Sequence, residues 1–338
     1  MRFLKNNIFV TAPSDSIRTI GDKLRLENAV KNFKDRGIEV VLGDTVNIIN
    51  KYDTKEYKLK AKELQEALLN DDIDIVISAN GGDSATNILE YMDFNKLKQN
   101  IDKEKIYQGF SDNTVITFLL TILSDWKSFY SPCFPTFGYN NWDETIQDNF
   151  KLLKGENIIQ KSQEKYERKS FKKVPGKELD GYNLDTDNNI FELNTIKEFE
   201  TKGIFLGGCL DILKNIVGTK YDKVKEYNEK HENIIWYIEN CIMDIQTLKE
   251  TLETMIKNEW FKNVKAFMIG KGKITLDEEF LEKQNNLLKE ILSKYNVPII
   301  INADFGHVRP YNTIINGAEG ILRYKGNGYT IEYLDVFE

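Results

Sequence analysis

Ser111, Glu239 and His307 are the residues of this chain whose types could together cleave an amide bond. Ser111 stands in Gly109-Phe-Ser-Asp112, between a short apolar run and a helix-like run. A serine at a sharp strand-to-helix turn exposes its hydroxyl, and the start of the helix stabilises negative charge that develops there. Serine is also a favoured helix N-cap, so the tetrapeptide alone is compatible with a structural residue as well as a nucleophile.

A nucleophilic serine needs a base to accept its proton and a group to orient that base. The chain has two histidines, His231 and His307. His231 lies in a highly charged stretch, 225–232, which is typical of a solvated helix or loop. His307 follows an apolar run in a glycine-flanked loop, where a side chain can be presented into a cleft. A loop histidine that is merely hydrogen-bonded is the alternative.

Glu239 and the pair Gly81-Gly82 are the other candidates. Glu239 ends the apolar run 234–238, where a buried carboxylate would need a partner. The alternative is a strand-end glutamate that faces water. Gly81-Gly82 follows the apolar run 73–79. Glycines let backbone N–H groups approach a ligand closely, as an oxyanion hole requires, although a pair of glycines can also be only a tight turn.

The first 140 residues alternate strand-like and helix-like segments, which indicates right-handed βαβ units and a parallel sheet. Ligands bind beyond the carboxyl ends of the strands in such sheets. Asn80-Gly81-Gly82 and Ser111 both follow predicted strands, so we expect them to share one crevice. The predicted strands are 7–12, 38–42, 73–79 and 105–110, and the predicted helices are 17–36, 54–70 and 114–123.

The pattern weakens from Trp142 to about Phe199, in a polar stretch with the turn signals Pro175-Gly176 and Asp180-Gly181. We therefore predict an N-terminal α/β domain over 1–145, a linker or surface insertion over 146–200, and a C-terminal α/β domain over 201–338. For the last, we predict strands 234–238, 264–269 and 297–301, a helix 244–257, and a β-hairpin 321–334 around Gly326-Asn327-Gly328.

Composition narrows the class of protein. The chain has 338 residues and a formal net charge of −7, which argues against a nucleic-acid or anionic-membrane partner. No apolar run approaches the roughly 20 residues of a membrane-spanning helix. Three widely spaced cysteines, Cys133, Cys209 and Cys241, form neither a disulfide framework nor a zinc-ligand pattern. A cytoplasmic protein is the expected default.

Several short motifs occur in the order typical of one family. The chain resembles the LD-carboxypeptidase family of serine peptidases, which includes the microcin C self-immunity peptidases, and the resemblance runs over nearly its whole length. The motifs are Val10-Thr-Ala-Pro-Ser14, Arg25-Leu-Glu-Asn-Ala29, the run from Asn80-Gly-Gly-Asp83 to Asp93, Gly109-Phe-Ser-Asp112, Gly203-Ile-Phe-Leu-Gly-Gly208, Ile238-Glu239 and Phe305-Gly-His-Val-Arg-Pro310.

The resemblance implies a catalytic Ser-His-Glu triad. Ser111 matches the nucleophile, His307 the general base and then acid, and Glu239 the group that orients the histidine. The oxyanion hole would use the backbone N–H groups of Asp112 and of the glycine pair, with Gly82 favoured over Gly81. The implied fold is a Rossmann-like, glutamine-amidotransferase-like parallel-sheet domain followed by a smaller C-terminal α/β (swivelling) domain. A homodimer is usual, and neither a metal nor an organic cofactor is implied.

The family holds two kinds of substrate. Its general activity removes a terminal D-amino acid from an L,D-peptide such as a murein tetrapeptide. The microcin-immunity branch cleaves the amide that joins a peptidyl or aminoacyl group to a nucleotide-like moiety, and aromatics such as Tyr166, Phe171 and Tyr182 could stack on a base. A small peptide or a peptidyl-nucleotide is therefore the expected partner.

The chain departs from the family pattern at two places. Cys209 stands where the family often has Asn, and Tyr130-Ser131-Pro132 stands where it tends to show a Gly-Pro step. Cys209 is interpreted as a small packing residue rather than a nucleophile, because no nearby cation or helix start is evident to lower its pKa.

A non-catalytic protein that binds a small molecule in the same crevice is the hypothesis from a different class. Retention of Ser, Glu and His at their matching motifs argues against it. Binding of NAD in the Rossmann manner is also disfavoured, since Gly81-Gly82 lacks the Gly-x-x-Gly continuation of that fingerprint.

Overall fold

The computed structural model describes residues 7–48, 53–103, 105–334 and 336. The chain divides into two compact units. Unit 1 takes in the residues up to Glu156 together with Lys169–Asn183, and unit 2 takes in Asn157–Arg168 and Leu184–Val336. The stretch 146–200 is thus shared, with 146–156 and 169–183 in unit 1 and 157–168 and 184–200 in unit 2.

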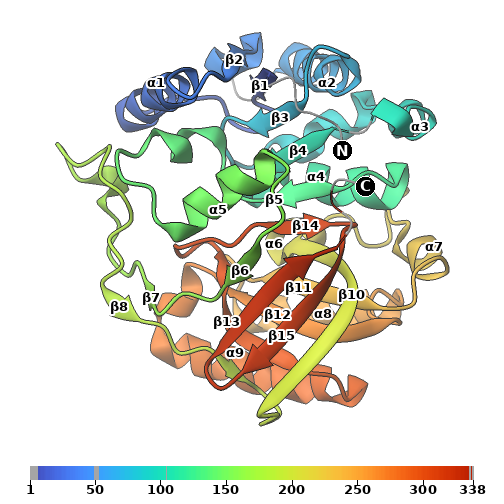
Figure 1. The fold of residues 1–338 in the computed structure, drawn as a ribbon. Coiled ribbons are helices and arrows are strands. Elements are labelled where there is room, and N and C mark those ends of the chain that lie inside the picture. The colour runs from blue at the N-terminus through green and yellow to red at the C-terminus, as the bar shows by residue number, and fades with distance from the viewer. Residues whose placement is uncertain (1–6, 49–52, 104, 335, 337–338) are drawn as a thin grey trace. The chain divides into compact units, whose positions relative to one another are not determined.

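Unit 1 is built on a parallel sheet whose strands lie in the order β5-β4-β3-β1-β2 (Figure 1). β3 is buried at all four positions, as expected for a strand covered on both faces. The strands are β1 Asn7–Thr11, β2 Glu39–Leu42, β3 Ile75–Ser78, β4 Ile106–Gly109 and β5 Ser128–Tyr130. The helices are α1 Ile20–Lys34, α2 Thr54–Leu69, α3 Phe94–Gln99, α4 Thr114–Ser124 and α5 Glu144–Leu153.

The ends of these elements follow from local chemistry. α1 begins at Ile20 rather than at the predicted residue 17, because the Thr19 side chain accepts a hydrogen bond from the Asp22 N–H and so caps the helix. α4 ends at Ser124, and its C-cap Asp125 adopts the left-handed conformation with φ 61°. The strand β5 follows after two further residues. A three-residue strand carries too little periodicity to be predicted, and β5 was missed.

Unit 2 contains a mixed eight-stranded sheet in the order β6-β16-β15-β10-β11-β12-β13-β9. Strands β10 to β13 are parallel, while β15, β16, β6 and β9 run antiparallel to their neighbours. Figure 1 shows β10 as the long yellow strand. The strands are β6 Ile159–Lys161, β9 Phe191–Glu192, β10 Glu198–Cys209, β11 Ile234–Glu239, β12 Val264–Lys271, β13 Ile299–Gly306, β15 Glu319–Lys325 and β16 Gly328–Tyr333.

Further short elements complete unit 2. A second small sheet pairs β7, Lys165–Tyr166, with β8, Thr186–Asp187. The helices are α6 Leu210–Leu213, α7 Val224–Asn228, α8 Ile245–Lys257 and α9 Glu278–Leu292, and β14 spans Ile314–Asn316. The predicted hairpin is confirmed as the antiparallel pair β15 and β16. The mixed α/β class and the parallel sheet predicted for the N-terminal half are confirmed as well.

The core of unit 2 is aromatic where β11 meets its neighbours. Trp236 stacks on Trp260 with ring centroids 5.8 Å apart, and Tyr237 meets the edge of Phe305 at 5.5 Å. All four side chains are at most 1% exposed. Such packing fixes the sheet that carries the strand ends of interest. None of the helices in the described part of the chain combines the length and apolarity that a membrane span requires.

Lys271 and Asp304 form a buried ion pair in unit 2. Lys271 Nζ is 2.7 Å from Asp304 Oδ1, and the two side chains are 6% and 0% exposed. The Asp304 carboxylate also accepts hydrogen bonds from the Gln163 N–H and from Asn188 Nδ2. The pair therefore joins β12 and β13 to the segments around residues 163 and 188.

Replacing Asp304 by Ala leaves the Lys271 ammonium buried without its counter-charge. Breaking a buried pair in this way costs about 3–5 kcal/mol, so we expect the urea midpoint to fall substantially. The matched control is Glu200→Ala, which breaks the exposed Arg323–Glu200 pair and is expected to cost less than about 1 kcal/mol. Equal midpoints for the two variants would contradict the prediction.

Candidate active site

Ser111 sits at a strained turn between β4 and α4. Phe110 is extended with φ −143° and ψ 154°, and Ser111 then turns to φ 60°. A non-glycine residue in this left-handed region costs about 1–2 kcal/mol. The N-cap of α4 is Asn113, so Ser111 is not the capping residue of that helix. The sharp strand-to-helix turn predicted from the sequence is therefore present. It holds a serine in a backbone conformation that glycine adopts with less strain.

The glycine pair after β3 lies against this turn. A Cβ placed on Gly81 would be 3.0 Å from the Ser111 Cβ and 3.5 Å from its Oγ, so a larger residue would crowd the serine. The Gly81 N–H donates to Asn80 Oδ1 at 3.1 Å. Gly82 has φ +155°, and a Cβ there would lie 2.6 Å from Ser14 Oγ. The two motifs expected to share a crevice are thus brought together within unit 1.

The Asp112 side chain ties the loops of this region to one another. It is 1% exposed and accepts hydrogen bonds from Ser14 Oγ at 2.5 Å and from the Ala85 N–H at 2.8 Å. Burial raises the pKa of the Asp112 carboxyl, although these hydrogen bonds oppose that shift. The sequence suggested only a backbone role for Asp112, because a contact that spans 98 positions leaves no local signal.

Lys60 is a second buried polar group that the sequence did not single out. It lies on α2, is 1% exposed, and donates from Nζ to the Ser14 carbonyl oxygen. Burial lowers the pKa of Lys60, and the negative charge of Asp15 is the largest influence that raises it. In the sequence Lys60 is one of several lysines of a charged amphipathic helix, so its burial could not be predicted.

In unit 2, Glu239 and His307 form a hydrogen-bonded pair. Glu239 is the last residue of β11 and is 0% exposed, while His307 follows the end of β13. His307 Nδ1 and Glu239 Oε1 are 2.8 Å apart. The partner that a buried carboxylate at this strand end requires is therefore the imidazole of His307. His231 lies elsewhere, against the ring of Tyr227 at 4.3 Å between centroids.

The backbone around His307 is shaped to allow this approach. Gly306 has φ +104°, and a Cβ on it would lie 3.2 Å from the Glu239 Cβ and 2.6 Å from the Lys271 carbonyl oxygen. That carbonyl oxygen accepts hydrogen bonds from the N–H groups of His307 at 2.7 Å and Val308 at 3.1 Å. β12 and the glycine together hold the histidine loop in place.

The environment of His307 changes its acidity. Burial alone would lower the pKa of the imidazole, but the charge of Glu239 and hydrogen bonds with Cys241 and Glu239 outweigh burial. The net result is a pKa raised above its ordinary value of 6.5. Because Nδ1 faces Glu239, exchange of a proton with a reacting group would have to take place at Nε2.

Cys209 belongs to the same cluster. It is the register partner of Glu239 across β10 and β11. One ligand atom each of Cys209, Glu239 and His307 lies within 4.8 Å of the others. Burial raises the pKa of the Cys209 thiol well above its ordinary value. Its burial and raised pKa agree with the prediction of a packing residue rather than a nucleophile. Its place beside Glu239 was not predicted, since nothing in the sequence shows that the end of β10 pairs with the end of β11.

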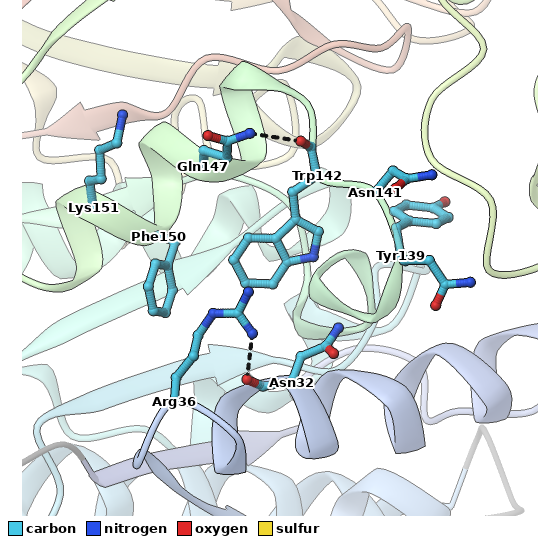
Figure 2. Close-up of a pocket in the computed structure, with 9 residues that line it drawn as sticks. Asn32, Arg36, Tyr139, Asn141, Trp142, Gln147, Phe150 and Lys151 are labelled. Carbon is cyan, nitrogen blue, oxygen red and sulfur yellow. Dashed lines mark hydrogen bonds between the residues drawn. The ribbon is translucent and has the colours of Figure 1, made fainter.

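A separate pocket of about 440 Å³ lies in unit 1 (Figure 2). Its lining includes Arg36, whose guanidinium lies 4.5 Å from the centre of the Trp142 ring, and Phe150 on α5. Arg36 also donates to the Asn32 carbonyl oxygen at 2.7 Å. Neither Ser111 nor the glycine pair lines this pocket, and we assign no chemistry to it.

The three aromatics considered for base stacking fall in different surroundings. The ring of Tyr182 contacts Tyr139 edge-on at 5.6 Å, and Lys177 Nζ lies 4.0 Å from the centre of the Phe171 ring. Tyr166 ends β7.

Two family models match the chain. Residues 8–131 match the LD-carboxypeptidase N-terminal domain, and residues 202–322 match the LD-carboxypeptidase C-terminal domain. Together they cover well over half of the sequence.

Similar proteins and structures are consistent with those matches. A Treponema pallidum protein named "Putative carboxypeptidase" is 24% identical over 312 residues, which cover 90% of this chain and 86% of that protein. The microcin C7 self-immunity protein MccF of Escherichia coli is 24% identical over 331 residues, 96% of this chain and 93% of that protein. The crystal structure of an MccF-like protein from Bacillus anthracis superposes with a TM-score of 0.78 at 21% identity, over 97% of this chain and 96% of that one.

The pKa of His307 can be measured directly, because the chain has two histidines. We expect one imidazole to titrate above 6.5 in an NMR pH titration. Glu239→Gln removes the negative charge that stabilises the imidazolium, so this pKa should move down by at least one unit. His231→Gln is the control, since it deletes the other set of imidazole signals. A His307 resonance that titrates at or below 6.5 in the unmodified protein would contradict the prediction.

Proposed function

The chain belongs to the LD-carboxypeptidase family, and from this premise we propose that it is a serine peptidase that hydrolyses an amide bond through an acyl-enzyme. We assign Ser111 as nucleophile, His307 as general base and then general acid, and Glu239 as the residue that orients His307. The observation that carries the proposal is the 2.8 Å contact between His307 Nδ1 and the buried Glu239 carboxylate.

The proposed first step is attack of Ser111 Oγ on the substrate carbonyl carbon while His307 Nε2 accepts the hydroxyl proton. Glu239 holds the imidazole by its other nitrogen and stabilises the imidazolium that forms. His307 then gives the proton to the leaving amine, which departs as the acyl-enzyme forms. Water attacks the acyl-enzyme in the same manner, with His307 again as the base. The mechanism requires Ser111 Oγ to come within hydrogen-bond reach of His307 Nε2.

The strained conformation of Ser111 supports its assignment. With its backbone at φ 60°, Ser111 directs its side chain away from the line of the strand. Backbone strain of this kind is concentrated at functional positions. For the oxyanion we assign the N–H groups of Asp112 and Gly82. Gly82 is favoured over Gly81 because the Gly81 N–H already donates to Asn80 Oδ1. The Asp112 carboxylate, bonded to Ser14 and Ala85, would hold its own backbone N–H in place.

We take removal of a terminal D-amino acid from an L,D-peptide as the primary activity, because that is the activity for which the family is named. Cleavage of a peptidyl-nucleotide amide is the second candidate. It is favoured by the coverage of MccF, which reaches 96% of this chain, and by MccF structures solved with glutamyl sulfamoyl guanosine and with aspartyl sulfamoyl adenosine.

A binding protein without catalysis is the alternative from another class, and the buried Glu239–His307 pair weighs against it. A binder has no need of an imidazole that is oriented by a buried carboxylate. We further propose, from the family, that the enzyme works as a cytoplasmic homodimer.

Ser111→Ala should lower kcat/KM by at least about 10³-fold, because removal of a triad nucleophile leaves only binding and oxyanion stabilisation. Ser111→Gly is the matched control for folding. It should abolish activity equally, while relief of the left-handed strain raises the free energy of unfolding by about 1 kcal/mol. Retention of activity in either variant would sink the assignment, and urea unfolding of both separates catalysis from stability.

A two-substrate assay distinguishes the candidate activities. The enzyme is incubated with murein tetrapeptide and, separately, with an aminoacyl sulfamoyl adenosine, and the products are identified by mass spectrometry. Release of the terminal D-amino acid, lost in Ser111→Ala, is the expected outcome. Cleavage of the nucleotide substrate alone would move the enzyme to the immunity branch. Cleavage of neither, with saturable binding of one, would favour the non-catalytic binder.

A further inference from the structure

We propose that Cys209, Glu239 and His307 form a binding site for a zinc ion, and that the bound ion reversibly blocks the peptidase. Cys209 and Glu239 end the neighbouring strands β10 and β11, and His307 follows β13 in the same sheet of unit 2. This inference goes beyond the proposed hydrolysis, and its central measurement does not depend on any catalytic activity.

The sheet itself brings the three ligand groups together. Cys209 and Glu239 are register partners in the parallel pair β10 and β11, so their side chains emerge side by side. His307 Nδ1 lies 2.8 Å from Glu239 Oε1. One ligand atom from each residue lies within 4.8 Å of the other two, before any adjustment toward an ion. Ligand atoms about 2.0–2.3 Å from one zinc ion lie roughly 3–4 Å apart, so small side-chain movements would close the site.

The donor set suits zinc. A thiolate, an imidazole and a carboxylate are the three ligand types that zinc accepts, and three protein ligands leave a fourth position for water. The thiolate disfavours Mg²⁺ and Ca²⁺, which prefer oxygen ligands. One thiolate, one carboxylate and a neutral imidazole also balance the two positive charges of the ion. That balance matters because Cys209 and Glu239 are 2% and 0% exposed.

Surrounding groups would hold the ligands in orientation. The Cys209 thiol donates to Asp211 Oδ2 at 3.6 Å, and that same oxygen accepts from the Cys241 N–H at 2.8 Å. Backbone hydrogen bonds to Lys271 fix His307 and Val308. Partners of this kind commonly support metal ligands, and they are already in place.

Metal binding and catalysis exclude one another at His307. Zinc takes the place of the Cys209 thiol proton and of the proton between His307 Nδ1 and Glu239. The thiol proton is released, and the bound neutral imidazole carries its one remaining proton on Nε2. An imidazole bound to zinc and no longer oriented by Glu239 cannot serve as the base for Ser111. The expected effect is inhibition that a chelator reverses. Asparagine, the residue that the family often has at position 209, would not supply the thiolate.

The test uses Co²⁺ as a spectroscopic substitute for zinc in the full-length protein under reducing conditions. We expect one Co²⁺ per chain, a thiolate-to-cobalt charge-transfer band in the near ultraviolet, and loss of the band when Zn²⁺ is added. Cys209→Ser should lose the band and weaken Zn²⁺ binding at least tenfold in calorimetry. The matched control is Cys133→Ser in unit 1, which should keep both.

The outcomes separate this proposal from the proposed activity. Absence of the band, or an unchanged band in Cys209→Ser, would overturn the zinc site whether or not the protein hydrolyses peptides. If Cys209→Ser unfolds, Glu239→Gln supplies a second variant that must lose affinity. In an active preparation Zn²⁺ should inhibit the unmodified enzyme at least tenfold more strongly than Cys209→Ser, and a chelator should restore the rate. Inhibition of equal strength in both would contradict the assignment of Cys209.

Discussion

A carboxylate buried at the end of β11 is the constraint on which the chemistry of unit 2 depends. Glu239 has no exposed surface, and an unpaired ionised group there would cost several kcal/mol. The imidazole of His307 supplies the compensation, and it reaches Glu239 only because Gly306 leaves room for the turn of the chain. The glycine at position 306 and the raised pKa of His307 are therefore two consequences of the buried carboxylate.

Unit 1 meets a comparable constraint at the strand ends of its own sheet. The strained backbone conformation of Ser111 persists because hydrogen bonds in the neighbouring loops restrict the conformations that the turn can adopt. Asp112 is fixed by Ser14 and Ala85, and Lys60 holds the Ser14 carbonyl. Strain of this kind is stable only where the neighbouring structure over-determines the backbone. Asp112 and Lys60 thus both hydrogen-bond to Ser14 from within unit 1.

The strands and helices with strong periodicity, and the residues at their ends, could be predicted from the sequence. Runs such as 73–79 and 234–238 are long enough to indicate buried strands. Ser111, Glu239 and His307 were candidates because each follows an apolar run, and the family resemblance gave them their predicted roles. The contacts that depend on strand order could not be predicted. The pairing of Cys209 with Glu239 and the link from Asp112 to Ser14 join distant parts of the chain. The burial of individual side chains such as Lys60 could not be predicted either, because it also depends on contacts between distant parts of the chain.

The position of Cys209 beside Glu239 is where this chain departs from the residue pattern of the family and where the departure affects the site. The sheet register places residue 209 beside Glu239, so the side chain at position 209 lies next to the Glu239–His307 pair. An amide at that position offers only a hard oxygen ligand, whereas a thiolate ligates a softer cation such as zinc. A proton and a metal ion then compete for the same space between Glu239 and His307. Because the first is needed for base catalysis and the second prevents it, one residue outside the proposed triad is enough to make the enzyme sensitive to zinc.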